Sequence, residues 1–191
     1  PISNGMKPII IGGLVVFVII VLFVVVIPFI FGVEFRGPDA GPPSQGFFVS
    51  TDQGVSWESR NDIKDSRSKL SGFTITDFVI HPTDGGYLLV GTTNSGIWRS
   101  RDEGKSWEKI IDKAGVLKAG AEVLRIATSE ANPKVWYVAV YQQNRGSLLK
   151  SEDDGESFRE VYFVPVERFG VFDVWIDEIN RSVFVVTGQG G

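Results

Sequence analysis

The stretch that decides the fold of this 191-residue chain is a short polar box, Ser50-Thr-Asp-Gln-Gly-Val-Ser-Trp57, which occurs three times. It returns as Ser100-Arg-Asp-Glu-Gly-Lys-Ser-Trp107 and as Ser151-Glu-Asp-Asp-Gly-Glu-Ser-Phe158, at offsets of 50 and 51 residues. Self-similarity at a fixed period of this length indicates a repeat architecture. The shared pattern is S-x-D-x-G-x-S followed by an aromatic residue.

The residue types of the box predict a tight connection between two strands. An aspartate can accept hydrogen bonds from backbone N–H groups of the turn, and a glycine two residues later permits a positive φ. We expect the closing aromatic residue to begin the next strand and to point into the core. The predicted structural set is Ser50, Asp52, Gly54, Trp57, Ser100, Asp102, Gly104, Trp107, Ser151, Asp153, Gly155 and Phe158.

Apolar segments around the boxes recur in the same order. Each box follows a glycine that opens a short strand, at Gly46, Gly96 and Gly146. Pairs of apolar segments also repeat: Phe78–Pro82 with Tyr87–Gly91, Val123–Ala127 with Val135–Val140, and Phe172–Ile176 with Val183–Val186. The predicted unit is strand A, turn, strand B, loop, strand C, box, strand D. Four antiparallel strands in a repeat of about 40–50 residues predict an all-β fold, a β-propeller.

The apolar excess of the chain is concentrated in Pro8–Val33, which contains no charged residue. A bilayer core of roughly 30 Å needs about 20 apolar residues in a helix, so this segment predicts one transmembrane helix. A cleaved signal peptide is the alternative, although its apolar run is usually only about 7–15 residues. Lys7 lies in the N-terminal stretch 1–7, which the positive-inside tendency places in the cytoplasm. A Gly/Pro linker, 34–45, then leads to extracytoplasmic blades at 46–191, displayed on the plasma or inner membrane.

Composition argues against several functions. The chain has 19 basic and 23 acidic residues and a formal charge of −4, whereas a nucleic-acid partner requires a clustered basic surface. Because there is no cysteine, the chain has no disulfide framework, thiolate metal site or cysteine nucleophile. We expect no cofactor.

The boxes resemble the Asp-box, or BNR, repeats of sialidases, sortilin-type Vps10 domains, some β-glucan hydrolases and photosystem II assembly-factor-like proteins. The resemblance covers most of residues 46–191. It implies that each box is a structural turn on the blade periphery, so that the box aspartates have no catalytic role. An anchor followed directly by short blades is most similar to the bacterial assembly-factor-like group.

The number of blades is small for a propeller. The first box has strands C and D only, and the last pair of segments supplies strands A and B only, so the repeats amount to three blades. Propellers typically have 4–8 blades. We interpret 46–191 as part of a longer propeller chain; the alternative is that further copies or another subunit complete the ring.

Few residues are candidates for catalysis. A sialidase-like site needs an arginine cluster, a tyrosine nucleophile and acid/base carboxylates. Arg125 is the arginine whose sequence context is most similar to that of a sialidase arginine, and we interpret it as an outward-facing strand residue. Glucan hydrolysis would use an aspartate pair on different blades. Asp77 and Asp173 fall at near-equivalent strand-A positions that could face a central channel, although such aspartates more often cap strand ends. His81, the only histidine, ends a strand and is interpreted as structural.

Other features favour ordinary roles. The acidic run Glu152–Glu156 lacks the ligand spacing of a calcium loop and is interpreted as a solvated turn. Asn180–Ser182 matches a glycosylation pattern that is common by chance, and Lys64–Lys69 is interpreted as an exposed loop. Inter-blade packing best explains the tryptophans on the strands and boxes, which are Trp57, Trp98, Trp107, Trp136 and Trp175.

Taken together, the sequence predicts a membrane-anchored extracytoplasmic β-propeller that acts as a non-enzymatic protein-binding or complex-assembly platform. Its expected partners are membrane lipid, around Pro8–Val33, and another protein or membrane complex. The alternative is an envelope-anchored glycan-binding or glycoside-hydrolysing protein. No catalytic, cofactor-binding or metal-binding residue is predicted.

Overall fold

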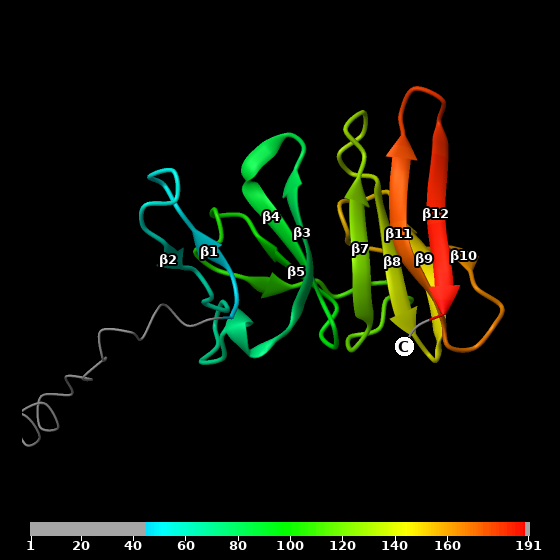
Figure 1. Ribbon diagram of the computed structural model, residues 1–191, viewed down its shortest axis with the longest axis horizontal. Coiled ribbons are helices and arrows are strands. Elements are labelled where there is room, and N and C mark those ends of the chain that lie inside the picture. The colour runs from blue at the N-terminus through cyan, green and yellow to red at the C-terminus, as the bar shows by residue number, and fades with distance from the viewer. Residues whose placement is uncertain (1–44, 190–191) are drawn as a thin grey trace, which may run out of the picture. The chain divides into compact units, whose positions relative to one another are not determined.

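The computed structural model describes residues 45–189, and within this range the chain is built almost entirely from β-strands (Figure 1). A single turn of 3₁₀ helix at Leu70–Gly72 is the helical segment of this range. The all-β prediction is therefore confirmed. None of the described segments is a helix with the length and hydrophobicity of a membrane span. The transmembrane helix expected at Pro8–Val33 lies outside the described residues.

Two complete four-stranded antiparallel sheets form the centre of the described region. One contains, in order, β3 (Ile75–His81), β4 (Asp84–Thr92), β5 (Ile97–Ser100) and β6 (Glu108–Lys109). The other contains β7 (Glu122–Thr128), β8 (Trp136–Gln142), β9 (Arg145–Ser151) and β10 (Arg159–Phe163). In each sheet every strand pairs with the next one along the chain. This is the predicted order of strands A to D.

A two-stranded sheet lies on either side of these two blades. The first pairs β1 (Phe48–Val49) with β2 (Glu58–Ser59) around the first box and corresponds to strands C and D. The last pairs β11 (Phe169–Asp177) with β12 (Ser182–Gln189) and corresponds to strands A and B. We call this last sheet the β11–β12 hairpin. Residues 45–189 thus contain two complete blades and two half blades.

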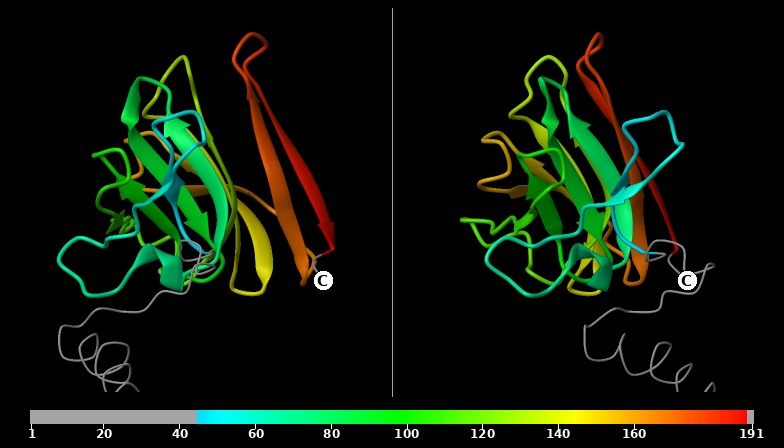
Figure 2. Two further views of the ribbon diagram at one scale, coloured as in Figure 1. Left: turned by 60° about the vertical axis from the view of Figure 1, so that its left-hand side comes forward. Right: turned by 90° about the vertical axis from the view of Figure 1, so that its left-hand side faces the viewer.

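The sheets pack face to face, as blades do in a propeller. The innermost strands β3, β7 and β11 lie side by side (Figure 1), and a view from the side of β1 and β2 shows the sheets one behind another (Figure 2). Three hydrophobic clusters hold consecutive sheets together. Because both faces of a central blade are covered, the centre of its second strand is continuously buried, as in Tyr87–Val90, where all four residues are buried.

Three of the five tryptophans pack between blades, as expected. Trp98, Trp107 and Trp136 are buried, and the Trp107 ring makes an edge-on contact with Phe47 of the preceding sheet. Within residues 45–189 Trp57 and Trp175 do not pack between blades, since their exposed fractions are 58% and 61%. Trp107 shows that a box aromatic packs against the preceding sheet, and the described residues contain no sheet before that of Trp57.

Candidate functional site

Each box folds into the same hydrogen-bonded turn. In the first box the Ser50 hydroxyl donates to Asp52 Oδ1 at 2.7 Å and accepts the Gly54 N–H at 2.7 Å. The Asp52 carboxylate accepts the Ser56 N–H at 2.9 Å and the Ser56 hydroxyl at 2.6 Å. The same four bonds recur in the second box and in the third. The aspartate is therefore occupied within its own turn.

The backbone of the box adopts left-handed conformations at two successive residues. The φ angles of Gly54, Gly104 and Gly155 are 91°, 84° and 80°, as expected for glycine at this position. Each preceding residue, a Gln, Glu or Asp, also has a positive φ, which the sequence pattern did not predict. A Cβ atom on Gly155 would lie 2.2 Å from the Trp136 ring, so this glycine also permits a close approach between turn and indole.

The hydrogen bonds of the box stabilise the ionised aspartate. Donation from Ser56, together with the Ser50 hydroxyl, lowers the pKa of Asp52 to about 2. The Ser157 hydroxyl likewise lowers the pKa of Asp153. A carboxylate that is held ionised by hydrogen bonds within its own turn stabilises that turn.

An aspartate–arginine–aspartate array crosses the three inner strands. Asp77, Arg125 and Asp173 follow one another at intervals of 48 residues, and each comes directly after a register shift in β3, β7 or β11. Bulges of this kind re-aim the side chain that follows them. Arg125 Nη1 lies 3.3 Å from Asp77 Oδ1, and Arg125 Nε lies 3.2 Å from Asp173 Oδ1. One guanidinium group therefore joins three consecutive sheets.

This geometry corrects the interpretation of Arg125 as simply an outward-facing residue. Its side chain is half exposed but pairs along the inner strands rather than pointing away from them. Asp77 is buried and its second oxygen accepts the Ile126 N–H at 2.6 Å. In a glycosidase the scissile bond lies between the two carboxyl groups. Here the guanidinium of Arg125 lies between Asp77 and Asp173 and pairs with both. The array therefore forms a contact between blades, and the space that a glycosidic bond would need is filled.

His81 lies in a polar cluster between the two complete blades. Its ring stacks on Tyr87 with centroids 4.6 Å apart, and its Nε2 lies 3.2 Å from the Pro133 carbonyl oxygen. Arg101 covers the Tyr87 ring at 4.1 Å and pairs with Asp154 at 3.0 Å. Burial raises the pKa of Tyr87 to about 12. The cluster joins blades, which agrees with a structural role for His81.

The acidic run Glu152–Glu156 is more than a solvated turn. Glu156 pairs with Lys113 and Arg99, and Asp154 pairs with Arg101, so these acids bind the preceding blade. No group of three or more acidic or histidine side chains within residues 45–189 is placed to hold a metal ion.

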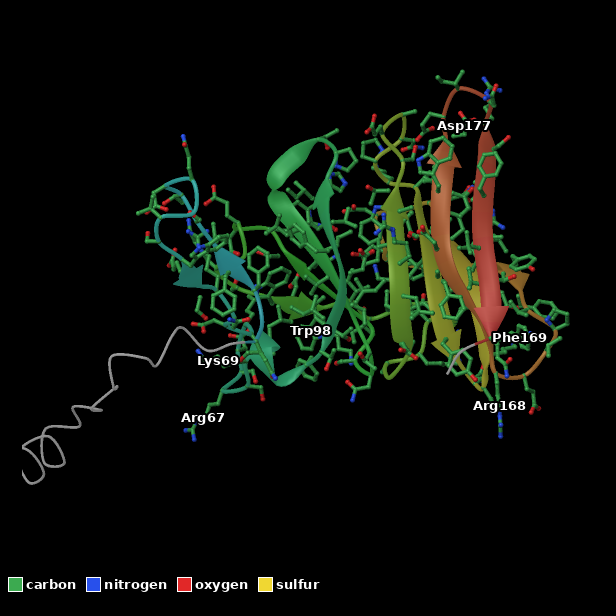
Figure 3. The ribbon with its side chains drawn as sticks, in the orientation of Figure 1. Arg67, Lys69, Trp98, Arg168, Phe169 and Asp177 are labelled. Carbon is green, nitrogen blue, oxygen red and sulfur yellow. The ribbon has the colours of Figure 1, made fainter. Side chains whose placement is uncertain are left out.

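Two exposed loops lie away from these clusters. Lys69 forms an ion pair with Asp62, and Figure 3 shows Arg67 and Lys69 on the loop that contains them. Asn180 lies in the turn of the β11–β12 hairpin, where its side chain donates to Asp177 at 2.7 Å. Neither loop brings together side chains that suggest catalysis.

A groove of about 660 Å³ opens between β7–β8 and the β11–β12 hairpin. Glu122 and Tyr141 line one side, Phe172 and Gly170 line the other, and Arg168 lies at its rim. No sequence motif pointed to this groove. The signal that could have found it is the pair of glycines, Gly170 and Gly188, in strand segments where the preceding repeat has Glu122 and Tyr141.

The blade order and the three box turns together define an Asp-box β-propeller protein. The profile of the sortilin–Vps10 family, described as "Sortilin, neurotensin receptor 3", matches residues 45–188. The chain therefore belongs to the sortilin–Vps10 family. A search of curated proteins gives no match.

Solved propeller structures support the same fold. An ancestral GH74 enzyme superposes with a TM-score of 0.57 at 17% identity, over 75% of this chain and 19% of that one. The GH74 xyloglucanase from Xanthomonas campestris superposes with a TM-score of 0.52 at 17% identity, over 79% of this chain and 26% of that one. This chain thus spans about a fifth to a quarter of those structures. At this identity the similarity concerns the fold alone.

Proposed function

We propose that the chain is a membrane-anchored, extracytoplasmic propeller protein that binds another protein and catalyses no reaction. The observation that carries the proposal is the outer face of the β11–β12 hairpin. Trp175 and Phe184, exposed by 61% and 55%, lie opposite each other on the two strands with ring centroids 5.8 Å apart. Val186 extends the same apolar surface. Contiguous exposed apolar patches mark protein interaction sites on soluble domains.

The register of the sheets indicates what kind of surface fits this face. The cross-strand pair Ala127 and Tyr137 of the preceding blade occupies the positions equivalent to Trp175 and Phe184. That pair is partly covered by the β11–β12 hairpin itself, since both residues pack against a cluster that includes Val174. The exposed face therefore corresponds to one that, one blade earlier, packs against the next sheet of the propeller, and we propose that a β-sheet of a partner protein occupies this position.

Two further observations support a binding role. Asp77 and Asp173, which lie at near-equivalent positions of β3 and β11, share the Arg125 guanidinium. The apolar segment Pro8–Val33 has the length and composition of a membrane anchor. Such an anchor would hold the blades beside a membrane complex, in line with the resemblance to the assembly-factor-like group.

The binding proposal is tested by co-purification of the full chain from membranes in mild detergent. We expect a stoichiometric protein partner that is lost when Trp175 and Phe184 are both replaced by serine. Val55→Ser, at an exposed position of the first box, is the matched control and should retain the partner. Purification of the chain alone, or retention of the partner by the double variant, would contradict the proposal. Turnover of fluorogenic glycosides would contradict the absence of catalysis.

The orientation is tested separately, since the chain has no cysteine. A single Ser66→Cys variant in the exposed loop should react with a membrane-impermeant maleimide in intact cells. Labelling only after lysis would place the blades in the cytoplasm and refute the orientation.

A further inference from the structure

The groove beside the β11–β12 hairpin has features that protein docking at the Trp175 face does not use. We call it the Phe172 groove; Glu122 and Tyr141 line one side, and Phe172 and Gly170 line the other. It lies toward the end of the hairpin where β11 begins, marked by Arg168 and Phe169 in Figure 3, whereas Asp177 marks the opposite end. Its volume of about 660 Å³ falls in the range of roughly 300–1,000 Å³ of small-molecule sites.

The Phe172 ring is supported from behind by backbone. A Cβ atom on Gly170 would lie 3.4 Å from Phe172 Cε1, and one on Gly188 would lie 3.1 Å from Phe172 Cε2. The ring therefore lies over two paired glycines whose lack of side chains makes room for it. With 38% of the residue exposed, the ring presents a flat apolar surface toward the groove.

Polar groups of both kinds surround this ring. Glu122 and Arg168 line the groove, and neither forms an ion pair with another residue in the described range 45–189. The Tyr141 hydroxyl lies 3.1 Å from Asn144 Oδ1 and keeps acceptor capacity. Gln189 adds an exposed amide. One carboxylate and one guanidinium leave the lining without net charge.

We propose that the Phe172 groove binds a neutral saccharide. The C–H face of a pyranose ring is apolar and flat, so it stacks on an exposed aromatic ring. Its vicinal hydroxyl groups can donate to the Glu122 carboxylate and accept from Gln189 and Arg168, and hydrogen bonds to charged groups are the stronger ones. The absence of net charge disfavours a polyanionic glycan. The groove volume of about 660 Å³ is sufficient for more than one sugar ring, so an oligosaccharide is the expected ligand.

The test uses the full chain in a detergent without a sugar headgroup, because alkyl maltosides would compete for the groove. The probes are neutral tetrasaccharides: cellotetraose, laminaritetraose, maltotetraose and mannotetraose. Saturation-transfer NMR identifies the binder, and calorimetry measures its affinity. We expect at least one to bind with a Kd of about 0.1–1 mM. Phe172→Ala should weaken binding at least about tenfold, and Phe172→Tyr should retain it.

Phe184→Ala is the matched control, since it removes an exposed ring from the same hairpin outside the groove. It should leave saccharide affinity unchanged while weakening the protein contact, so the two proposals fail independently. Glu122→Gln, which alters one groove group without removing the ring, should weaken binding about threefold or more. The proposal is overturned if no tetrasaccharide binds at about 10 mM, if Phe172→Ala binds normally, or if only sialylated or sulfated glycans or unglycosylated peptides bind.

Discussion

Replacement of the box tryptophans tests the way in which one blade is held to the preceding one. Trp107 and Trp57 occupy the same position of the same turn, but only Trp107 has a sheet to pack against in the described region. It is fully buried, contacts Phe47, and donates from its indole N–H to the Arg60 carbonyl oxygen at 2.9 Å. Trp107→Ala should therefore be far more damaging than Trp57→Ala.

The difference can be given a magnitude. Removal of a buried tryptophan side chain costs about 3–5 kcal/mol, and this range includes the loss of a hydrogen bond worth about 1 kcal/mol. A single domain is stable by only about 5–15 kcal/mol. Trp57 is largely exposed, and a substitution at such a site changes stability by about 0.5 kcal/mol. With a urea dependence of about 2 kcal/mol per molar, Trp107→Ala should lower the midpoint by about 2 M and Trp57→Ala by about 0.25 M.

Urea denaturation followed by far-UV circular dichroism measures both midpoints on the full chain. The two variants are matched, because each removes one indole from the same position of a turn with the same hydrogen bonds. Equal midpoint losses would refute the inference that a box aromatic packs against the preceding sheet. A large loss for Trp57→Ala alone would show that its indole is covered by a part of the protein outside residues 45–189.

Three further predictions concern the turn and the inner strands. Gly155→Ala should lower the free energy of unfolding by about 2–5 kcal/mol, because the new methyl group would overlap a buried indole; Gly115→Ala, with positive φ but open space, should cost only about 1–2 kcal/mol in the same urea titration. Arg125→Met should cost about 1–2 kcal/mol by leaving buried Asp77 without its ion pair, and an Asp77→Asn background should reduce that cost in a double-mutant cycle; additive losses would argue against the array. Because the folded pKa of Asp52, about 2, lies below an unfolded value of about 3.9, its contribution to stability is full above about pH 4 and is lost as pH falls toward 2. Asp52→Asn should flatten the acid limb of a plot of midpoint against pH, and an unchanged limb would contradict the assignment.

Much of the fold could be predicted from the sequence, because the box encodes its own geometry. Four of the seven positions supply the two hydroxyls, the carboxylate and the positive-φ glycine that close the turn, and three copies of the box indicate where strands C and D lie in each blade. The β-branched and aromatic segments then complete each blade. Local chemistry of this kind does not depend on distant parts of the chain, which is why the prediction of four antiparallel strands per blade is confirmed.

The inner array and the groove depend on relationships that a strand pattern does not carry. The side chain of Arg125 is aimed by a one-residue register shift in β7, and a bulge leaves little trace in an alternating apolar pattern. The sequence did contain one signal that these three residues lie side by side, namely the 48-residue spacing of Asp77, Arg125 and Asp173. Likewise, the burial of Trp57 and Trp175 depends on whether another sheet packs over them, and the local sequence does not specify which sheet packs on a given face of a blade.

The internal repeats offer their own guide to function in a propeller of this kind. Positions that are alike in all three boxes, such as Asp52, Asp102 and Asp153, hold the turn that every blade requires. The candidate binding surfaces lie where equivalent positions differ: the covered pair Ala127 and Tyr137 gives way to exposed Trp175 and Phe184, and a glutamate–tyrosine pair gives way to two glycines. We therefore propose these two faces of the β11–β12 hairpin, rather than the boxes, as the places at which this chain binds its ligands.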